Sequence, residues 1–221
     1  MRTCARAPPP RFTARNRLSS TGRRVGAVVL GAGGSARLGV PKQLIEFRSE
    51  PLVRRAAGAA ADAGAAPVIV VVGAEAADTI LALNGLPFTS TVLNAQWRAG
   101  LASSLVAGIR ELQRLDAKAD GVLIVTADQP LVTAPALRRL LDAFAGGARL
   151  VAAEYAATVG VPAAIGREHF DALLALEGDA GAGRWLRGKG DAVRRISLPE
   201  AALDIDTAED AALLATLSES A

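Results

Sequence analysis

A strand-like run of aliphatic residues, Val25 to Leu30, leads directly into a glycine-rich segment, Gly31 to Lys42. The run is continuously apolar, which predicts a strand that is buried on both faces. The small residues that follow let backbone N–H groups approach a phosphate closely, and Arg37 and Lys42 supply positive charge. The combination predicts a phosphate-binding loop at the carboxyl end of a buried strand.

Apolar strand-like runs and helix-length segments continue to alternate along the chain. The pattern predicts further strands at 67–72, 89–93, 121–126 and 150–155, and helices at 51–64, 74–83, 100–115 and 134–145. In the 100–115 helix, Leu101, Leu105, Ile109 and Leu112 are predicted to share the buried face. Apolar strands separated by helices predict a mostly parallel sheet covered on both sides. The predicted fold is therefore a single Rossmann-like, three-layer α/β domain.

Charge divides the 221 residues into an N-terminal extension, residues 1–24, and a domain, residues 25–221. The extension has seven arginines, three consecutive prolines and no acidic residue, so we expect it to be disordered. It resembles a transit peptide, although a solvated extension or a start codon assigned too far upstream is the favoured interpretation. The domain has 18 basic and 22 acidic residues, so its charge does not favour nucleic-acid binding.

Cysteine and histidine usage narrows the function classes further. One cysteine, Cys4, and one histidine, His169, exclude a disulfide framework and a structural zinc site. We expect His169 to be a surface or packing residue. No apolar run reaches the length of a membrane span, so we expect a cytoplasmic protein that does not bind a membrane.

Two known phosphate loops nearly match the glycine-rich segment. Gly34 to Gly39 has P-loop spacing, but Val40 and Pro41 follow where a lysine and a hydroxyl residue are needed. Gly31-x-Gly33-x-x-Ala36 also fits the dinucleotide fingerprint, which needs a helix to begin at the glycines and an acid near the end of the second strand. Pro41 argues against that helix, yet an NAD(P)- or flavin-dependent oxidoreductase remains an alternative.

Polar residues also follow two later predicted strands. The stretch from Asn94 to Leu105 contains Trp97 and a predicted helix start at Gly100, where free N–H groups can bind an anion. Trp97 can equally be a core residue. Asp128 follows the 121–126 strand, where it suits a Mg²⁺ ligand beside a phosphate loop, or a turn residue that bonds its own backbone.

The motifs resemble those of the MobA-like nucleotidyltransferases. Residues 30–42 read L-G-A-G-G-S-A-R-L-G-V-P-K, similar to the signature LAAGxSxR(M/L)G followed by a lysine. The Pro-Lys-Gln context of Lys42 and the Gln-Pro after Asp128 are similar to the molybdenum cofactor cytidylyltransferases. The stretches around Trp97 and from Asp204 to Asp210 also resemble the family, although Thr207 and Asp210 are equally spaced as a helix cap.

The resemblance implies a nucleotide-diphospho-sugar transferase type of fold and a Mg²⁺-dependent transfer of CMP from CTP to the molybdopterin cofactor, with release of pyrophosphate. It implies Arg37, Lys42 and Asp128 as catalytic residues, and Asp128 and Asp206 as metal ligands. The implied nucleotide-binding residues are Leu30, Gly31, Ala32, Gly33, Gly34, Ser35, Arg37, Lys42, Asn94, Gly100, Ser103 and Ser104.

Acceptor choice is the weakest part of the resemblance. Residues 155–162 and 177–182 resemble the acceptor-side segments, but Ala157 replaces a usual glycine and Val161 a frequent histidine. The implied partners are CTP or another NTP, the molybdopterin cofactor, and a molybdoenzyme or its chaperone that receives the product. A non-catalytic carrier of the cofactor is a further alternative. Base choice depends on backbone contacts, so CTP rests on the resemblance alone.

Overall fold

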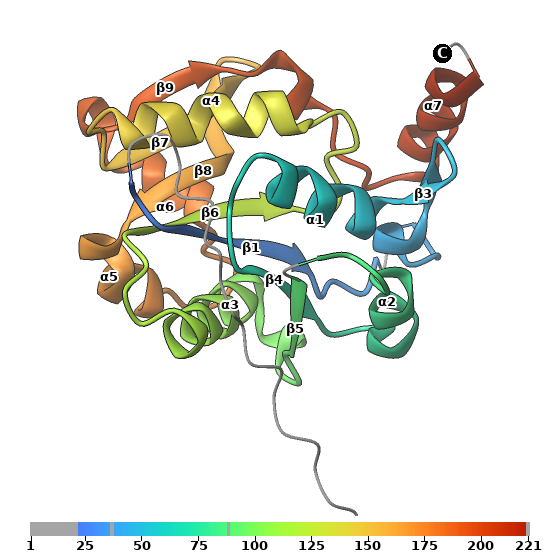
Figure 1. Ribbon diagram of the computed structural model, residues 1–221. Coiled ribbons are helices and arrows are strands. Elements are labelled where there is room, and N and C mark those ends of the chain that lie inside the picture. The colour runs from blue at the N-terminus through green and yellow to red at the C-terminus, as the bar shows by residue number, and fades with distance from the viewer. Residues whose placement is uncertain (1–21, 36–37, 88, 220–221) are drawn as a thin grey trace, which may run out of the picture.

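The computed structural model describes residues 22–35, 38–87 and 89–219. Most of the predicted extension and Arg37 lie outside these ranges. Among the described residues, seven strands form one sheet in the order β5-β4-β1-β6-β8-β7-β9 (Figure 1). Its strands are β1 (Val25–Gly31), β4 (Val68–Val72), β5 (Thr89–Leu93), β6 (Gly121–Thr126), β7 (Leu150–Tyr155), β8 (Thr158–Gly166) and β9 (Arg194–Ser197). The five predicted strands all occur, within one residue of their predicted ends.

Helices cover both faces of this sheet (Figure 1). They are α1 (Leu52–Asp62), α2 (Ala76–Ala82), α3 (Leu101–Leu115), α4 (Ala134–Ala145), α5 (Phe170–Leu174), α6 (Ala182–Arg187) and α7 (Ala208–Glu219). Helices α1 and α4 pack on one face, whereas α3, α5 and α6 pack on the other. Successive residues of β4 alternate between the two cores, which explains why its sequence is continuously apolar. The predicted three-layer, mostly parallel α/β fold is confirmed.

One strand runs against the others. β8 is antiparallel to both β6 and β7, whereas the remaining neighbours pair in parallel. A two-residue turn joins β7 to β8, and its residues Ala156 and Ala157 both have positive φ angles, 46° and 57°. Such turns usually contain Asn or Gly, so two alanines give no sequence signal for this hairpin.

Leu101 differs from its predicted place in the core. It is 43% exposed, whereas Leu105, Ile109 and Leu112 are buried as predicted. Leu101 is the first residue of α3 and packs against Gly181, where an added Cβ would come 2.5 Å from the leucine side chain. The inward positions of this first turn are instead taken by Ala102 and Ser104.

Two peripheral features complete the domain. The short hairpin of β2 (Glu46–Phe47) and β3 (Glu50–Pro51) packs with α7 around a small cluster containing Phe47, Ile205 and Leu214. At the other end, Arg24 is tied to the domain because its guanidinium lies 2.5 Å from Asp116. Within the described ranges, no helix combines the length and apolar character needed to cross a membrane.

Candidate active site

The glycine-rich loop leaves β1 at the carboxyl edge of the sheet and is held on both sides. Ala32 accepts a hydrogen bond from the Ala74 amide, 3.1 Å away, and the Ser35 hydroxyl accepts one from the Lys42 amide at 2.9 Å. The Trp97 ring lies against Gly34, where a Cβ would come 2.6 Å from it. Trp97 is therefore part of the loop's support, and glycine at position 34 permits that contact.

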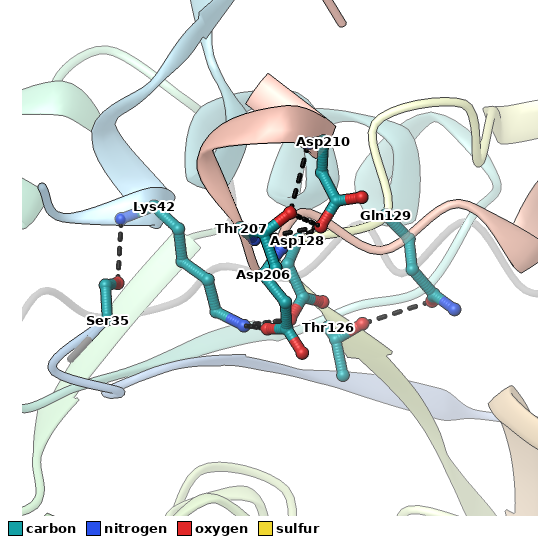
Figure 2. A network of polar contacts seen from close by, with 8 residues as sticks. All are labelled: Ser35, Lys42, Thr126, Asp128, Gln129, Asp206, Thr207 and Asp210. Atoms are coloured by element: carbon teal, nitrogen blue, oxygen red, sulfur yellow. Dashed lines mark hydrogen bonds and ion pairs between the residues drawn. The ribbon is translucent and has the colours of Figure 1, made fainter. Parts of the chain in front are cut away.

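Lys42, Asp128 and Asp206 meet beside this loop (Figure 2). The Lys42 ammonium lies 2.5 Å from Asp128 Oδ2 and 2.8 Å from Asp206 Oδ1. Lys42 begins a short 3₁₀ turn after the loop, and Asp128 follows β6, the strand next to β1. Parallel pairing of these strands brings both residues to the same sheet edge, although 86 positions separate them.

The C-terminal segment brings Asp206 to this edge. The Ile205 amide donates to the Asp128 carbonyl at 3.0 Å, which fixes the segment against the end of β6. Asp206 then precedes a capping box, in which Thr207 Oγ1 accepts from the Asp210 amide and Asp210 Oδ2 accepts from the Thr207 amide. Asp210 also accepts from the Asp206 amide at 3.0 Å, which orients the backbone of Asp206.

Electrostatics distinguish the members of this cluster. Burial lowers the pKa of Lys42, but the charges and hydrogen bonds of Asp128 and Asp206 outweigh it and raise the pKa above 10.5. Lys42 is therefore positively charged at neutral pH. Burial and then the charge of Asp128 raise the pKa of nearby Asp204 to about 6. Two carboxylates contact the single ammonium, and the charge of Asp204 acts on the same cluster, which therefore carries excess negative charge.

The donor set suits a hard divalent cation. Asp128 and Asp206 each place a carboxylate oxygen within hydrogen-bond distance of the Lys42 nitrogen, so a cation already sits between them. Mg²⁺ takes one or two protein carboxylates and leaves its other positions to water and substrate oxygens. In the described part of the chain, no group of three or more His, Cys, Asp or Glu residues could hold a metal ion. Two protein carboxylates match this preference of Mg²⁺, in which water and substrate supply the remaining oxygens.

A second, neutral group of polar residues lies on the other side of the loop. Asn94 follows β5 and is 6% exposed. Its side-chain amide donates to Ser103 Oγ at 2.8 Å and to Ser104 Oγ at 3.0 Å, and its carbonyl oxygen accepts from the Gln96 amide. The structure therefore brings together three of the predicted nucleotide-binding residues.

The start of α3 differs from the predicted row of free amides. The Ala102 amide donates to the Gly178 carbonyl at 3.0 Å, and the Ser103 amide donates to the Gly100 carbonyl at 3.2 Å. The loop around Gly178 packs so closely that a Cβ at Gly100 would lie 2.3 Å from it, and Gly100 has a φ of 109°. The Ala102 N–H group, which we expected to face a ligand, is therefore already hydrogen-bonded within the protein.

The sequence reasoning missed two supporting residues. Gln129 is buried, and its side-chain amide donates to the carbonyls of Val161 in β8 and Ala201. It thereby ties the end of β6 to the next strand. Asp204 lies two positions before Asp206. The sequence analysis named it only as the first residue of the motif from Asp204 to Asp210 and gave it no role. His169 has no contact with the site; its ring packs edge-on against Trp185 at 5.6 Å.

The fold and the family of the chain are those of nucleotidyltransferases. Residues 27–195 match the family described as the MobA-like NTP transferase domain. The chain belongs to this family, and the resemblance identified from its motifs is confirmed.

Individual relatives extend over most of the chain. Nicotine blue oxidoreductase from Paenarthrobacter nicotinovorans is 33% identical over 200 residues, which are 84% of this chain and 93% of that protein. The structure of an Rv0371c homologue from Mycobacterium sp. strain JC1 is 35% identical, with a TM-score of 0.74 over 90% of this chain and 98% of that one. Rv0371c from Mycobacterium tuberculosis H37Rv, in complex with manganese, is 28% identical, with a TM-score of 0.68 over 87% and 97%.

Proposed function

We propose that the protein transfers CMP from CTP to the molybdopterin cofactor in a reaction that depends on a divalent cation and releases pyrophosphate. The observation that carries the proposal is the cluster of Lys42, Asp128 and Asp206 beside the glycine-rich loop. Ligands of α/β domains bind at this edge of the sheet. The choice of CTP and molybdopterin rests on the motifs Pro41-Lys42-Gln43 and Asp128-Gln129-Pro130.

The chemistry needs positioning and charge stabilisation more than a protein nucleophile. An oxygen of the acceptor's phosphate attacks the α-phosphorus of CTP, and the bond from that phosphorus to the bridging oxygen of the β-phosphate breaks as pyrophosphate leaves. We assign Lys42 to the charge that develops on the leaving group. Arg37 is assigned the same role from the motif, since it lies outside the described residues.

The glycine-rich loop and the neutral group share the nucleotide in this proposal. We assign the triphosphate to the stretch from Leu30 to Ser35, whose small residues let backbone amides approach it. The nucleoside is assigned to Asn94, Gly100, Ser103 and Ser104.

Asp128 and Asp206 would hold the cation, which we take to be Mg²⁺. When bound, the cation neutralises the charge of the phosphates and orients them. The manganese in the Rv0371c complex supports divalent-metal use in this family. We further propose a cytoplasmic location and delivery of the product to a molybdoenzyme or its chaperone.

An oxidoreductase is a second candidate because of the name of the 33% identical relative. A dinucleotide fingerprint requires a helix that opens at the glycines. In the described residues between β1 and Leu52, the only helical segment is the 3₁₀ turn at Lys42–Leu44. This geometry favours the transferase over a nicotinamide enzyme of the Rossmann type.

The test is pyrophosphate release from CTP, GTP, ATP and UTP with Mg²⁺ or Mn²⁺, with and without purified molybdopterin cofactor. We expect release from CTP only when the cofactor and a divalent cation are present. Release without the cofactor, or none with any nucleotide, contradicts the proposal. Parallel titrations with NADH, NADPH and FAD, followed by fluorescence, would identify the oxidoreductase instead.

A further inference from the structure

A cavity of about 190 Å³ opens between the β7–β8 hairpin, α6 and β9. Its lining includes Glu154, Thr158, Arg187 and Arg195. The cavity is on the sheet face that α3, α5 and α6 cover, since its lining residues Val159, Leu186 and Val193 belong to that core. None of the candidate site residues described above lines it.

The segment 184–195, which supplies Leu186, Arg187, Gly190, Val193 and Arg195 to the lining, has a charge opposite to that of the rest of the domain. Residues 184–195 contain five basic residues and one acidic residue. The remainder of residues 25–221 contains 13 basic and 21 acidic residues. A concentration of positive charge in an otherwise acidic domain attracts anions to this one place.

The two arginines of the lining retain unused donors. Arg187 Nη1 donates to the Val159 carbonyl at 3.1 Å, and Arg195 Nη1 forms a long ion pair with Glu154, 3.4 Å away. A guanidinium has five N–H donors in a planar fork that matches phosphate and carboxylate oxygens. With Glu154 counted, the lining carries one net positive charge, which suits a single anionic group.

Strand β8 connects this cavity to the Lys42 cluster. Gln129, the neighbour of Asp128, donates to the Val161 carbonyl at 3.2 Å, and Arg187 donates to the Val159 carbonyl. Two residues along a strand span about 7 Å. Tyr155 senses charges of both the Lys42 cluster and the cavity. Burial, then the charge of Asp204 and, more weakly, that of Asp128 raise its pKa, whereas the charge of Arg187 lowers it.

We propose that this cavity binds a second anionic group of the acceptor, at the end remote from the phosphate that attacks CTP. The inference rests on the proposed transfer function, because it assumes an acceptor whose phosphate reaches Asp128. A molecule held by both groups must carry two separated negative groups. The cavity lined by Arg187 and Arg195, here called the arginine cavity, would thereby select against acceptors whose only anionic group is the phosphate.

The first experiment measures transfer kinetics of the full chain with CTP and molybdopterin. Arg187→Gln and Arg195→Gln should each raise the KM for the acceptor by about tenfold, with the KM for CTP unchanged, because each removes charge-assisted hydrogen bonds. Arg139→Gln, the same change at an exposed position of α4, should have no effect. An unchanged acceptor KM in the double variant would overturn the proposal.

The second experiment detects the cavity without turnover, using inorganic phosphate as the probe. NMR amide signals of Ala157 and Gly190 should shift on titration, and the two Arg→Gln variants should weaken this binding by about tenfold. Glu154→Gln should strengthen it, because Arg195 loses its competing partner; a gain of this kind cannot come from misfolding. If the wild type shows no shift, the cavity proposal fails. If it shifts but transfers no CMP, the cavity stands and the proposed function fails.

Discussion

The glycine-rich loop lies between two groups of polar residues that differ in charge. On the β6 side, Lys42, Asp128 and Asp206 form an ionic cluster, whereas on the β5 side Asn94 forms neutral hydrogen bonds with two serines. The strand order β5-β4-β1-β6 places the loop between them. Ionic groups stabilise charge that changes during a reaction, whereas neutral hydrogen bonds mainly orient a bound molecule. Substitutions on the ionic side should therefore change kcat, whereas substitutions on the neutral side should change KM.

The largest expected effect comes from removing one charge of the ionic cluster. Asp128→Asn should lower kcat on the order of a thousandfold, since it removes a proposed cation ligand while preserving the shape of the side chain. Because the Ile205 amide bonds to the backbone of Asp128, the fold should persist. The measurement is pyrophosphate release, with circular dichroism as a check of folding. Asp142→Asn, at an exposed position of α4, is the control; activity retained in Asp128→Asn would contradict the metal assignment.

Removing the lysine separates two roles of the cluster. Lys42→Ala should lower kcat about a hundredfold, through loss of charge at the leaving group. The same variant should bind Mn²⁺ more tightly in the absence of nucleotide, because no ammonium competes for the two carboxylates. Electron paramagnetic resonance of free Mn²⁺ measures the second effect. Lys118→Gln, at an exposed lysine that is remote from the cluster in sequence, is the control. Weaker Mn²⁺ binding in Lys42→Ala would mean that the cation does not use these carboxylates.

The neutral side should respond in KM. Asn94→Ala leaves the partners of a buried amide unsatisfied and should lower the free energy of unfolding by roughly 1–3 kcal/mol. It should raise the KM for CTP by about tenfold, with kcat nearly unchanged, since neutral hydrogen bonds are worth about 1 kcal/mol each. Urea denaturation and initial rates measure the two effects. Asn84→Ala, at an exposed position, should change neither quantity. A fall in kcat alone in Asn94→Ala would contradict the predicted difference between the two sides.

The smallest expected effect is a coupling within the ionic cluster. The Asp204 carboxyl should titrate near pH 6 in ¹³C NMR of the metal-free protein. Its folded pKa is above its ordinary 3.8, so the stability that this proton contributes is full below pH 3.8 and is lost as the pH rises through about 6. In Asp128→Asn the pKa should fall toward 3.8 without reaching it, because burial, the larger cause, remains. An unchanged pKa would show that Asp204 does not sense Asp128.

Much of the fold was predictable because continuous apolar runs and helix-length segments carry strong local signals. The antiparallel course of β8 was not, because its turn consists of two alanines and the strand direction depends on that turn. In the site, Lys42 and Asp128 were predictable from their motifs and strand ends. The role of Gln129 was not, because its side chain bonds to backbone carbonyls 32 and 72 positions away. The role of Gly178 was not, because its carbonyl accepts from the amide of Ala102, a residue distant in the sequence.

The reversed direction of β8 has a consequence for how acceptor preference can change. Because β8 runs against β7, the turn at Ala156 and Ala157 emerges at the same edge as the ends of β1 and β6. Its neighbours line the arginine cavity, while the ionic cluster is held by other segments. Turns of this kind tolerate insertions and substitutions well. Under the proposed function, the hairpin is thus the place where laboratory evolution can diversify acceptor recognition while the residues proposed to bind the nucleotide stay intact.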